Sequence, residues 1–380
     1  MKHSLLQEAC DVNTPDERLC ELAKSKDKEI CKAVALNPNT APDLLLTLFQ
    51  KHPVEVLHNI CLELILLENP NFLEELYQNN SKAIWEKGLP LFYLHWASTH
   101  KDELVRANLG YNHDLPQDIL EKLARDVSSK VRWSVARNST VPIHILEQLA
   151  CDTDYTVRMT IAQRRDLSNS IFEILALDSE QYIRSNIASH WNAPKFILEK
   201  LSNDDDSLIR RIIASRYDTP VYLLEKLADD IESTVRGVVA SNRNAPKKVL
   251  EKLASDKVSS VRRDVAHNFL TPSSVLAKLA NDEKVSVRQA VAKNTSIPTE
   301  SIKKLAYDKE NTVRLHIAQN HATPANILEK LSTEAILNIR VAVAKNSHTS
   351  TSVLEKLVSD ESRRVRRVAK KTLKEKKKHN

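Results

Sequence analysis

One arginine recurs at intervals of 26 residues along most of this 380-residue chain. It occupies positions Arg106, Arg132, Arg158, Arg184, Arg210, Arg236, Arg262, Arg288, Arg314, Arg340 and Arg366. An acid precedes it by six residues in ten units: Asp126, Asp152, Asp178, Asp204, Asp230, Asp256, Asp282, Asp308, Glu334 and Asp360. A guanidinium can bind a carboxylate with two parallel hydrogen bonds, or bind helix-end carbonyls. Because each arginine comes with an acid, we interpret the column as a structural ladder rather than as a row of anion sites.

A second set of residues follows each column arginine by seven positions. It includes two arginines and three aromatic residues in five consecutive units: Arg165, Trp191, Tyr217, Arg243 and Phe269. The preceding position is usually Asn, but three consecutive units depart from it: Arg164, His190 and Arg216. Arg and aromatic residues are frequent at protein-binding hot spots. This pattern predicts a partner-binding strip along one edge, although turn residues that only cover helix ends would explain it too.

The cysteines are a further group with chemical potential. Cys10, Cys20, Cys31 and Cys61 all lie in the first 61 residues, but none forms a close C-x2-C pair. Cluster and zinc sites usually have such pairs, so we expect ordinary thiols and neither a metal nor a cofactor. The sequence also lacks H-E-x-x-H, P-loop and G-x-S-x-G motifs, and it contains only 3 glycines. These absences favour a non-enzymatic protein.

The repeated segment predicts two short helices in each unit. Thr271-Pro272 is typical of a helix start, with Thr as the N-cap and Pro as the first helical residue. Val275, Leu276 and Leu279 then form one apolar face, and a second helix follows Asp282. Asn294 stands where that helix must end, and we expect it to adopt the left-handed conformation there. Second-helix positions directed away from the core would line a mildly basic concave face that includes Trp133, Arg137, Arg211, Arg263, His267, Lys293 and Lys345.

The wording of the unit resembles known helical repeats. "LEKLASDKVSSVRRDVAHN", residues 250–268, is similar to the leucine-rich repeat variant, and the Asp-x5-Arg pair resembles the HEAT repeat. The resemblance covers residues 103–370, with a worn copy at 15–42. It implies a right-handed α-solenoid with helices on two faces, and it implies that the architecture is all-α. We therefore expect about ten repeats of 26 residues each.

Residues 1–100 depart from the pattern and predict an N-terminal cap followed by a divergent helical region. The repeats would occupy 101–370, and 371–380 would form a basic tail. The formal net charge is +6, but residues 363–380 hold ten Lys or Arg against one Glu, whereas residues 1–100 hold nine against fourteen Asp or Glu. The repeat body is therefore nearly neutral. The tail is either a solubilising cap with a frayed end or an arm that binds nucleic acid or another acidic surface.

No segment has the length and apolarity of a membrane span, and the N-terminus lacks the features of a secretory signal. We therefore expect a cytoplasmic monomer. The function most consistent with these features is a scaffold that binds another macromolecule, most simply a protein, through the edge strip or the concave face. A nucleic-acid-binding or DNA-repair-related solenoid that uses the strip and the basic tail is the alternative.

Overall fold

The protein is an all-helical repeat protein. The computed structural model describes residues 2–379, and within that range it contains α-helices and a single 3-10 helix but no strand. Contacts divide the chain into two compact units, residues 1–183 and 184–380. No helix in the described part of the chain combines the length and apolarity needed to cross a membrane. The predicted boundary near residue 100, between the divergent N-terminal region and the regular repeats, stays a prediction.

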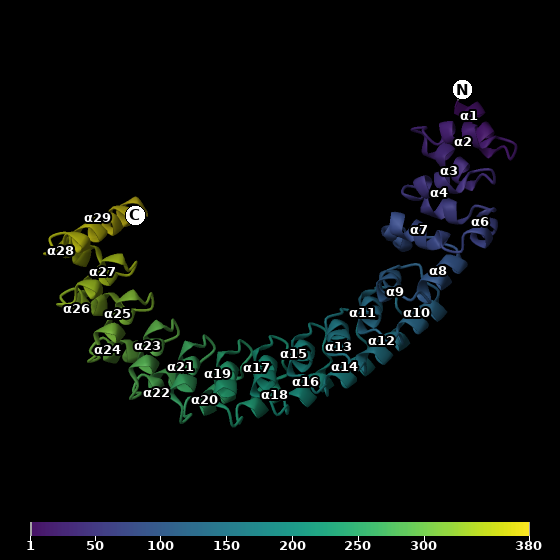
Figure 1. Ribbon diagram of the computed structural model, residues 1–380. Helices are drawn as coiled ribbons and strands as arrows, with labels where there is room; N and C mark the ends of the chain where they lie inside the picture. Colours follow the sequence, from purple (N-terminus) through teal and green to yellow (C-terminus); the bar gives the residue numbers. More distant parts are fainter. Residues whose placement is uncertain (1, 380) are drawn as a thin grey trace. The chain divides into compact units, whose positions relative to one another are not determined.

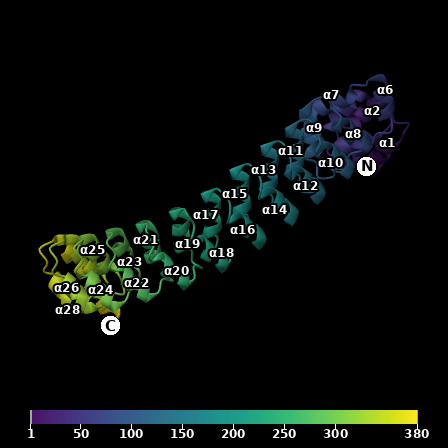
Figure 2. The same ribbon diagram turned by 90° about the horizontal axis from the view of Figure 1, so that it is seen from below.

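The second unit consists of two rows of short helices (Figures 1 and 2). One row contains the second helices of the repeats: α17 (Ser207–Ser215), α19 (Ser233–Ser241), α21 (Ser259–His267), α23 (Val285–Lys293), α25 (Asn311–Gln319), α27 (Leu337–Lys345) and α29 (Arg363–His379), preceded by α15 (Gln181–Ser189), which spans the boundary between the units. The other row contains the first helices: α16 (Lys195–Leu201), α18 (Val221–Leu227), α20 (Lys247–Leu253), α22 (Ser273–Leu279), α24 (Thr299–Leu305), α26 (Ala325–Leu331) and α28 (Thr351–Leu357). Within this unit the second helices line the inner side of the curve (Figure 1).

The first unit repeats this alternation with less regular helices. Its second-helix row is α1 (Lys2–Cys10), α3 (Lys28–Leu36), α5 (Pro53–Leu57), the 3-10 helix η1 (Ser81–Trp85), α9 (Glu103–Gly110), α11 (Ser129–Arg137) and α13 (Tyr155–Ala162). The other helices are α2 (Asp16–Leu22), α4 (Pro42–Phe49), α6 (Leu62–Glu68), α7 (Phe72–Asn79), α8 (Leu91–Ser98), α10 (Gln117–Leu123), α12 (Ile143–Ala150) and α14 (Asn169–Leu175). The region predicted to be divergent thus has the same two rows, but the alternation is interrupted where α6 and α7 follow one another in one row.

The core lies between the two rows and follows the predicted periodicity. Leu276 on α22 and Val265 on α21 are fully buried. Ala266, which follows Val265, is also fully buried. A side chain this small allows adjacent second helices to pack closely, which explains why Ala recurs at that position.

Two predictions about the helix ends are wrong. Pro272, rather than Thr271, occupies the N-cap position of α22, and Thr271 Oγ1 instead donates to the Val265 carbonyl at 2.5 Å. Asn294 is extended (φ −71°, ψ 129°), and among the described residues only Gly88 has a positive φ. The side chain of Asn294 reaches back to the preceding repeat, so the chain needs no left-handed residue to turn.

The basic tail predicted at 371–380 is helical as far as the described residues extend. Helix α29 continues to His379, and Lys376 Nζ donates to the Thr349 carbonyl at 2.7 Å. The final residue, Asn380, lies outside the described residues. The basic end of the chain is therefore presented as a helix docked on the last repeat.

Candidate functional site

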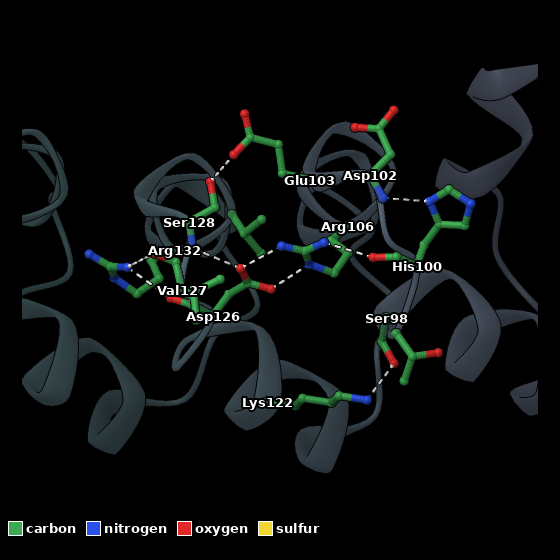
Figure 3. A network of polar contacts seen from close by, with 12 residues as sticks. Ser98, His100, Asp102, Glu103, Arg106, Lys122, Asp126, Val127, Ser128 and Arg132 are labelled. Carbon is green, nitrogen blue, oxygen red and sulfur yellow. Dashed lines mark hydrogen bonds and ion pairs between the residues drawn. The ribbon is translucent and has the colours of Figure 1, made fainter.

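Each ladder arginine joins two consecutive repeats. Figure 3 shows that Arg106 directs its guanidinium at the carboxylate of Asp126 in the next repeat. Its Nε donates to Asp126 Oδ2 at 2.6 Å and its Nη2 donates to Oδ1 at 2.9 Å. Its Nη1 donates to the His100 carbonyl at 2.7 Å, which fixes the turn before its own helix. One side chain thus satisfies a carboxylate and a backbone carbonyl in different repeats.

The second unit continues the same geometry. Arg262 Nε and Nη2 donate to Asp282 at 2.6 and 2.9 Å, and Arg262 Nη1 donates to the Asp256 carbonyl at 2.8 Å. The arginine therefore binds the side chain of the acid 20 residues later, and only the backbone of the acid six residues earlier. Arg288 binds Asp308 and Arg314 binds Glu334 in the same way.

The ladder groups are largely buried. The side chains of Arg262 and Asp282 are 12% and 7% exposed. Burial opposes ionisation of the Asp282 carboxyl, but hydrogen bonds from Arg262 and from the Lys284 backbone NH outweigh it, so the pKa of Asp282 is lowered. Asp256 and Asp308 also have lowered pKa values, with the same opposing causes. Because the guanidinium groups are occupied and enclosed, this column has little capacity to bind an external anion.

A second ladder, which the sequence analysis missed, is made by asparagines. Asn268 Nδ2 donates to the Ala240 carbonyl at 2.7 Å and to the Asn242 carbonyl at 2.9 Å, both in the preceding repeat. The equivalent contacts are made by Asn37, Asn112, Asn138, Asn242, Asn294, Asn320 and Asn346. The recurrence of Asn was visible in the sequence, but its side-chain partners could not be identified without the stacking geometry.

The departures from the Asn column have a structural role. Arg164 Nη1 donates to the Ala136 and Asn138 carbonyls, both at 2.8 Å, and Arg216 Nη1 makes the matching pair with Ala188 and His190. Their side chains are only 9% and 8% exposed and form ion pairs with Asp166 and Asp218. His190 is 9% exposed, and its Nδ1 accepts from the Asn192 backbone NH. These three predicted partner-binding residues therefore offer little surface to a partner.

The next position is exposed. In the second unit Trp191, Tyr217 and Phe269 are 66%, 81% and 59% exposed, and Arg243 between the last two is exposed as well. We call these four residues the edge strip. Neighbouring rungs are linked, because Asn244 Nδ2 donates to the Tyr217 carbonyl. Arg165 belongs to the first unit and is also exposed.

The predicted concave residues divide between the two units. In the first unit Arg137 lies over the Trp133 ring at 5.0 Å, and Tyr111 meets that ring edge-on. Trp133 and Arg137 line a hollow of about 310 Å³, together with Thr160 and Gln163. In the second unit Arg211 is exposed, and Arg263 pairs with Asp264 at 3.0 Å. The structure thus brings Trp133 and Arg137 together, whereas Arg211 and Arg263 are carried by different helices.

The cysteines form no recognisable ligand set in the described part of the chain. Cys10 is exposed, Cys31 is buried, and Cys20 and Cys61 are intermediate. Within residues 2–379, no group of three or more His, Cys, Asp or Glu side chains is arranged to hold a metal ion. Burial raises the pKa of the Cys31 thiol, which favours its protonated form.

Comparison with known proteins gives structural similarities only. No family model matches the sequence, and no curated protein matches it. The chain is similar to "a leucine-rich repeat variant with a novel repetitive protein structural motif", at 24% identity and a TM-score of 0.42, over 66% of this chain and 88% of that one. It is also similar to Kap121p bound to RanGTP (12% identity, TM-score 0.39, 98% and 48% of the two chains) and to the Pds5–Scc1 complex (13%, 0.30, 96% and 72%). TM-scores this low carry no argument about a partner. The kind of partner must therefore be inferred from the surface of the protein itself.

Proposed function

We propose that this protein is a non-catalytic scaffold that binds another protein through the edge strip of its second unit. The observation that carries the proposal is the exposure of Trp191, Tyr217 and Phe269 at one repeat position. The same position holds Thr295 and His321 in later repeats, so the fold does not require an aromatic residue there. An in-register series of exposed aromatic residues that the repeat does not require supports an interaction surface at this edge.

The chemistry of the edge strip suits a protein partner. Tyr, Trp and Arg dominate binding hot spots, and a buried aromatic side chain removes roughly 150–250 Å² of surface from water. Phe196 and Tyr222 lie five residues beyond Trp191 and Tyr217 and are 42% and 49% exposed. Two consecutive repeats therefore each carry two exposed aromatic side chains.

Nucleic acid is the second candidate, and helix α29 is the observation that favours it. Its exposed cations include Arg363, Arg364, Arg367, Lys370, Lys371 and Lys374. A binder of duplex DNA usually spreads phosphate contacts over much of its surface, and here the densest cations gather on one terminal helix. The protein partner is therefore the better-supported proposal.

An affinity capture experiment separates these candidates. The wild-type protein and a Trp191→Ala/Tyr217→Ala variant would be used as bait in native lysate, with and without nuclease. The proposal predicts a protein that survives nuclease treatment and moderate salt and is depleted with the variant. A partner that disappears with nuclease, or that the variant retains fully, would contradict it. Tyr307→Ala is a matched control, because Tyr307 is 67% exposed but lies outside the edge strip.

A further inference from the structure

The inner surface of the second unit carries a hollow that the edge strip does not include. Its volume is about 380 Å³, and it lies against α25, α27 and α29. Its apolar lining comes from Leu315, Val341 and Ala342, and its cations are Lys345 and Arg364. The lining thus combines three apolar residues with polar and cationic side chains, and the volume is near the lower end of the range of ligand sites.

A row of cations extends from this hollow in both directions. The position five residues after the ladder arginine holds Lys293, Gln319, Lys345 and Lys371 in successive repeats, and all four side chains are exposed. We call these four residues the basic row. The second helices α21 to α27 contain a single acid, Asp264, and Arg263 already pairs with it at 3.0 Å. On these helices the positive charge of the row comes from Lys293 and Lys345, whereas Lys371 on α29 pairs with Glu375 at 3.8 Å.

Neighbouring histidines respond to this charge. Burial lowers the pKa of His316, and the positive charge of Lys293 lowers it further. His267 behaves in the same way, with burial as the larger cause and Lys293 as the next. These directions agree with a cation-rich surface.

We propose that the basic row binds an acidic peptide segment in polyproline II conformation, with an apolar side chain inserted into the hollow. Packed helices lie roughly 8–10 Å apart, so successive rungs of the row have about that spacing. Three residues of a polyproline II chain complete one turn and rise about 9 Å, so every third side chain lies on the same face. Acids at every third peptide position would therefore face consecutive rungs, where Lys293 and Lys345 can pair with them and the Gln319 amide can donate a hydrogen bond to one.

The spacing favours such a peptide over nucleic acid. Duplex DNA carries one negative charge per roughly 1.7 Å of its axis, which is far denser than one cation per rung. The inference goes beyond the edge strip, since it uses other residues and shares with the proposed function only the premise that the partner is a protein.

The test uses synthetic probes and the full-length protein. The main probe is a fluorescein-labelled dodecapeptide with glutamate at every third position, one leucine, and otherwise serine and alanine. The comparison probes are a peptide of the same composition with its glutamates consecutive, and a single-stranded oligonucleotide of equal length. Lys345→Glu/Arg364→Glu reverses two cations beside the hollow, and Lys247→Glu/Lys248→Glu on α20 is the control with the same change in net charge.

The proposal predicts that the spaced peptide binds most tightly. The Lys345→Glu/Arg364→Glu variant should weaken its binding at least about tenfold, because two attractions become repulsions, and the α20 control should bind as the wild type does. Circular dichroism checks that both variants are folded. Equal affinity for the two peptides, tighter binding of the oligonucleotide, or unchanged binding by the Lys345→Glu/Arg364→Glu variant would overturn the proposal. A Trp191→Ala/Tyr217→Ala variant should bind the peptide normally, so failure here is distinct from failure of the edge strip.

Discussion

Removing one rung of the arginine ladder should destabilise the second unit far more than removing an exposed arginine. In Arg262→Ala the Asp282 carboxylate, whose side chain is 7% exposed in the wild type, loses the two hydrogen bonds from Arg262, and the Asp256 carbonyl loses its Nη1 donor. Breaking one partner of a fully buried pair costs about 3–5 kcal/mol, whereas an exposed pair contributes about 0.2–1 kcal/mol. Because Asp282 keeps the Lys284 backbone NH as a donor, we expect an intermediate loss of about 2–4 kcal/mol.

The neighbouring residue provides a matched control. Arg263 lies on the same helix and pairs with Asp264, but its side chain is 44% exposed. Arg263→Ala should therefore cost less than about 1 kcal/mol. The assay is urea unfolding followed by circular dichroism, with both variants compared with wild type at neutral pH. Equal effects of the two substitutions, or no measurable loss for Arg262→Ala, would show that the ladder is a solvated feature and refute the reasoning.

Two other predictions concern the ladders. Asn268→Ala removes the side-chain donor from the Ala240 and Asn242 carbonyls and should lower the free energy of unfolding by about 2–4 kcal/mol. Substitution of the exposed Thr295 should leave the free energy of unfolding unchanged. Equal urea midpoints for the two variants would contradict this prediction. The pKa values of Asp126, Asp230, Asp256, Asp282, Asp308 and Asp360 are lowered, by hydrogen bonds that outweigh burial. As the pH falls, these carboxylates should therefore take up protons in the unfolded chain before they do so in the folded protein. Stability should be full above about pH 5 and should fall as the pH drops through about 4 and below. A urea midpoint that does not change between pH 7 and pH 3 would contradict this prediction.

The sequence predicted the repeat unit and its buried faces because both depend on local periodicity. The apolar spacing of Val275, Leu276 and Leu279 requires only that one helix has one buried face. The sequence does not decide which acid each arginine binds, because the choice between Asp256 and Asp282 for Arg262 depends on how the repeats stack. The structure settles it in favour of the next repeat.

Asn294 illustrates the limit of local rules. Asn at a helix end commonly adopts the left-handed conformation, but here its side chain donates to the Ala266 and Asn268 carbonyls 28 and 26 residues earlier. That contact holds the backbone extended. A similar contact explains why the side chains of Arg164 and Arg216 are largely buried, although they were predicted to face a partner. Their side chains are long enough to reach the equivalent carbonyls of the preceding repeat. The exposed fractions of Trp191 and Tyr217, 66% and 81%, fit the predicted strip, whereas the inward direction of the preceding position became clear only from the structure.

The most direct test of the proposed function is a binding titration with the captured partner. Wild type, Trp191→Ala/Tyr217→Ala and the Tyr307→Ala control would be compared at two salt concentrations, with helicity checked by circular dichroism. If the edge strip binds a protein, the double variant should lose several kcal/mol of binding free energy, the control should bind as wild type does, and moderate salt should change little. A double variant that binds as tightly as wild type would contradict the account.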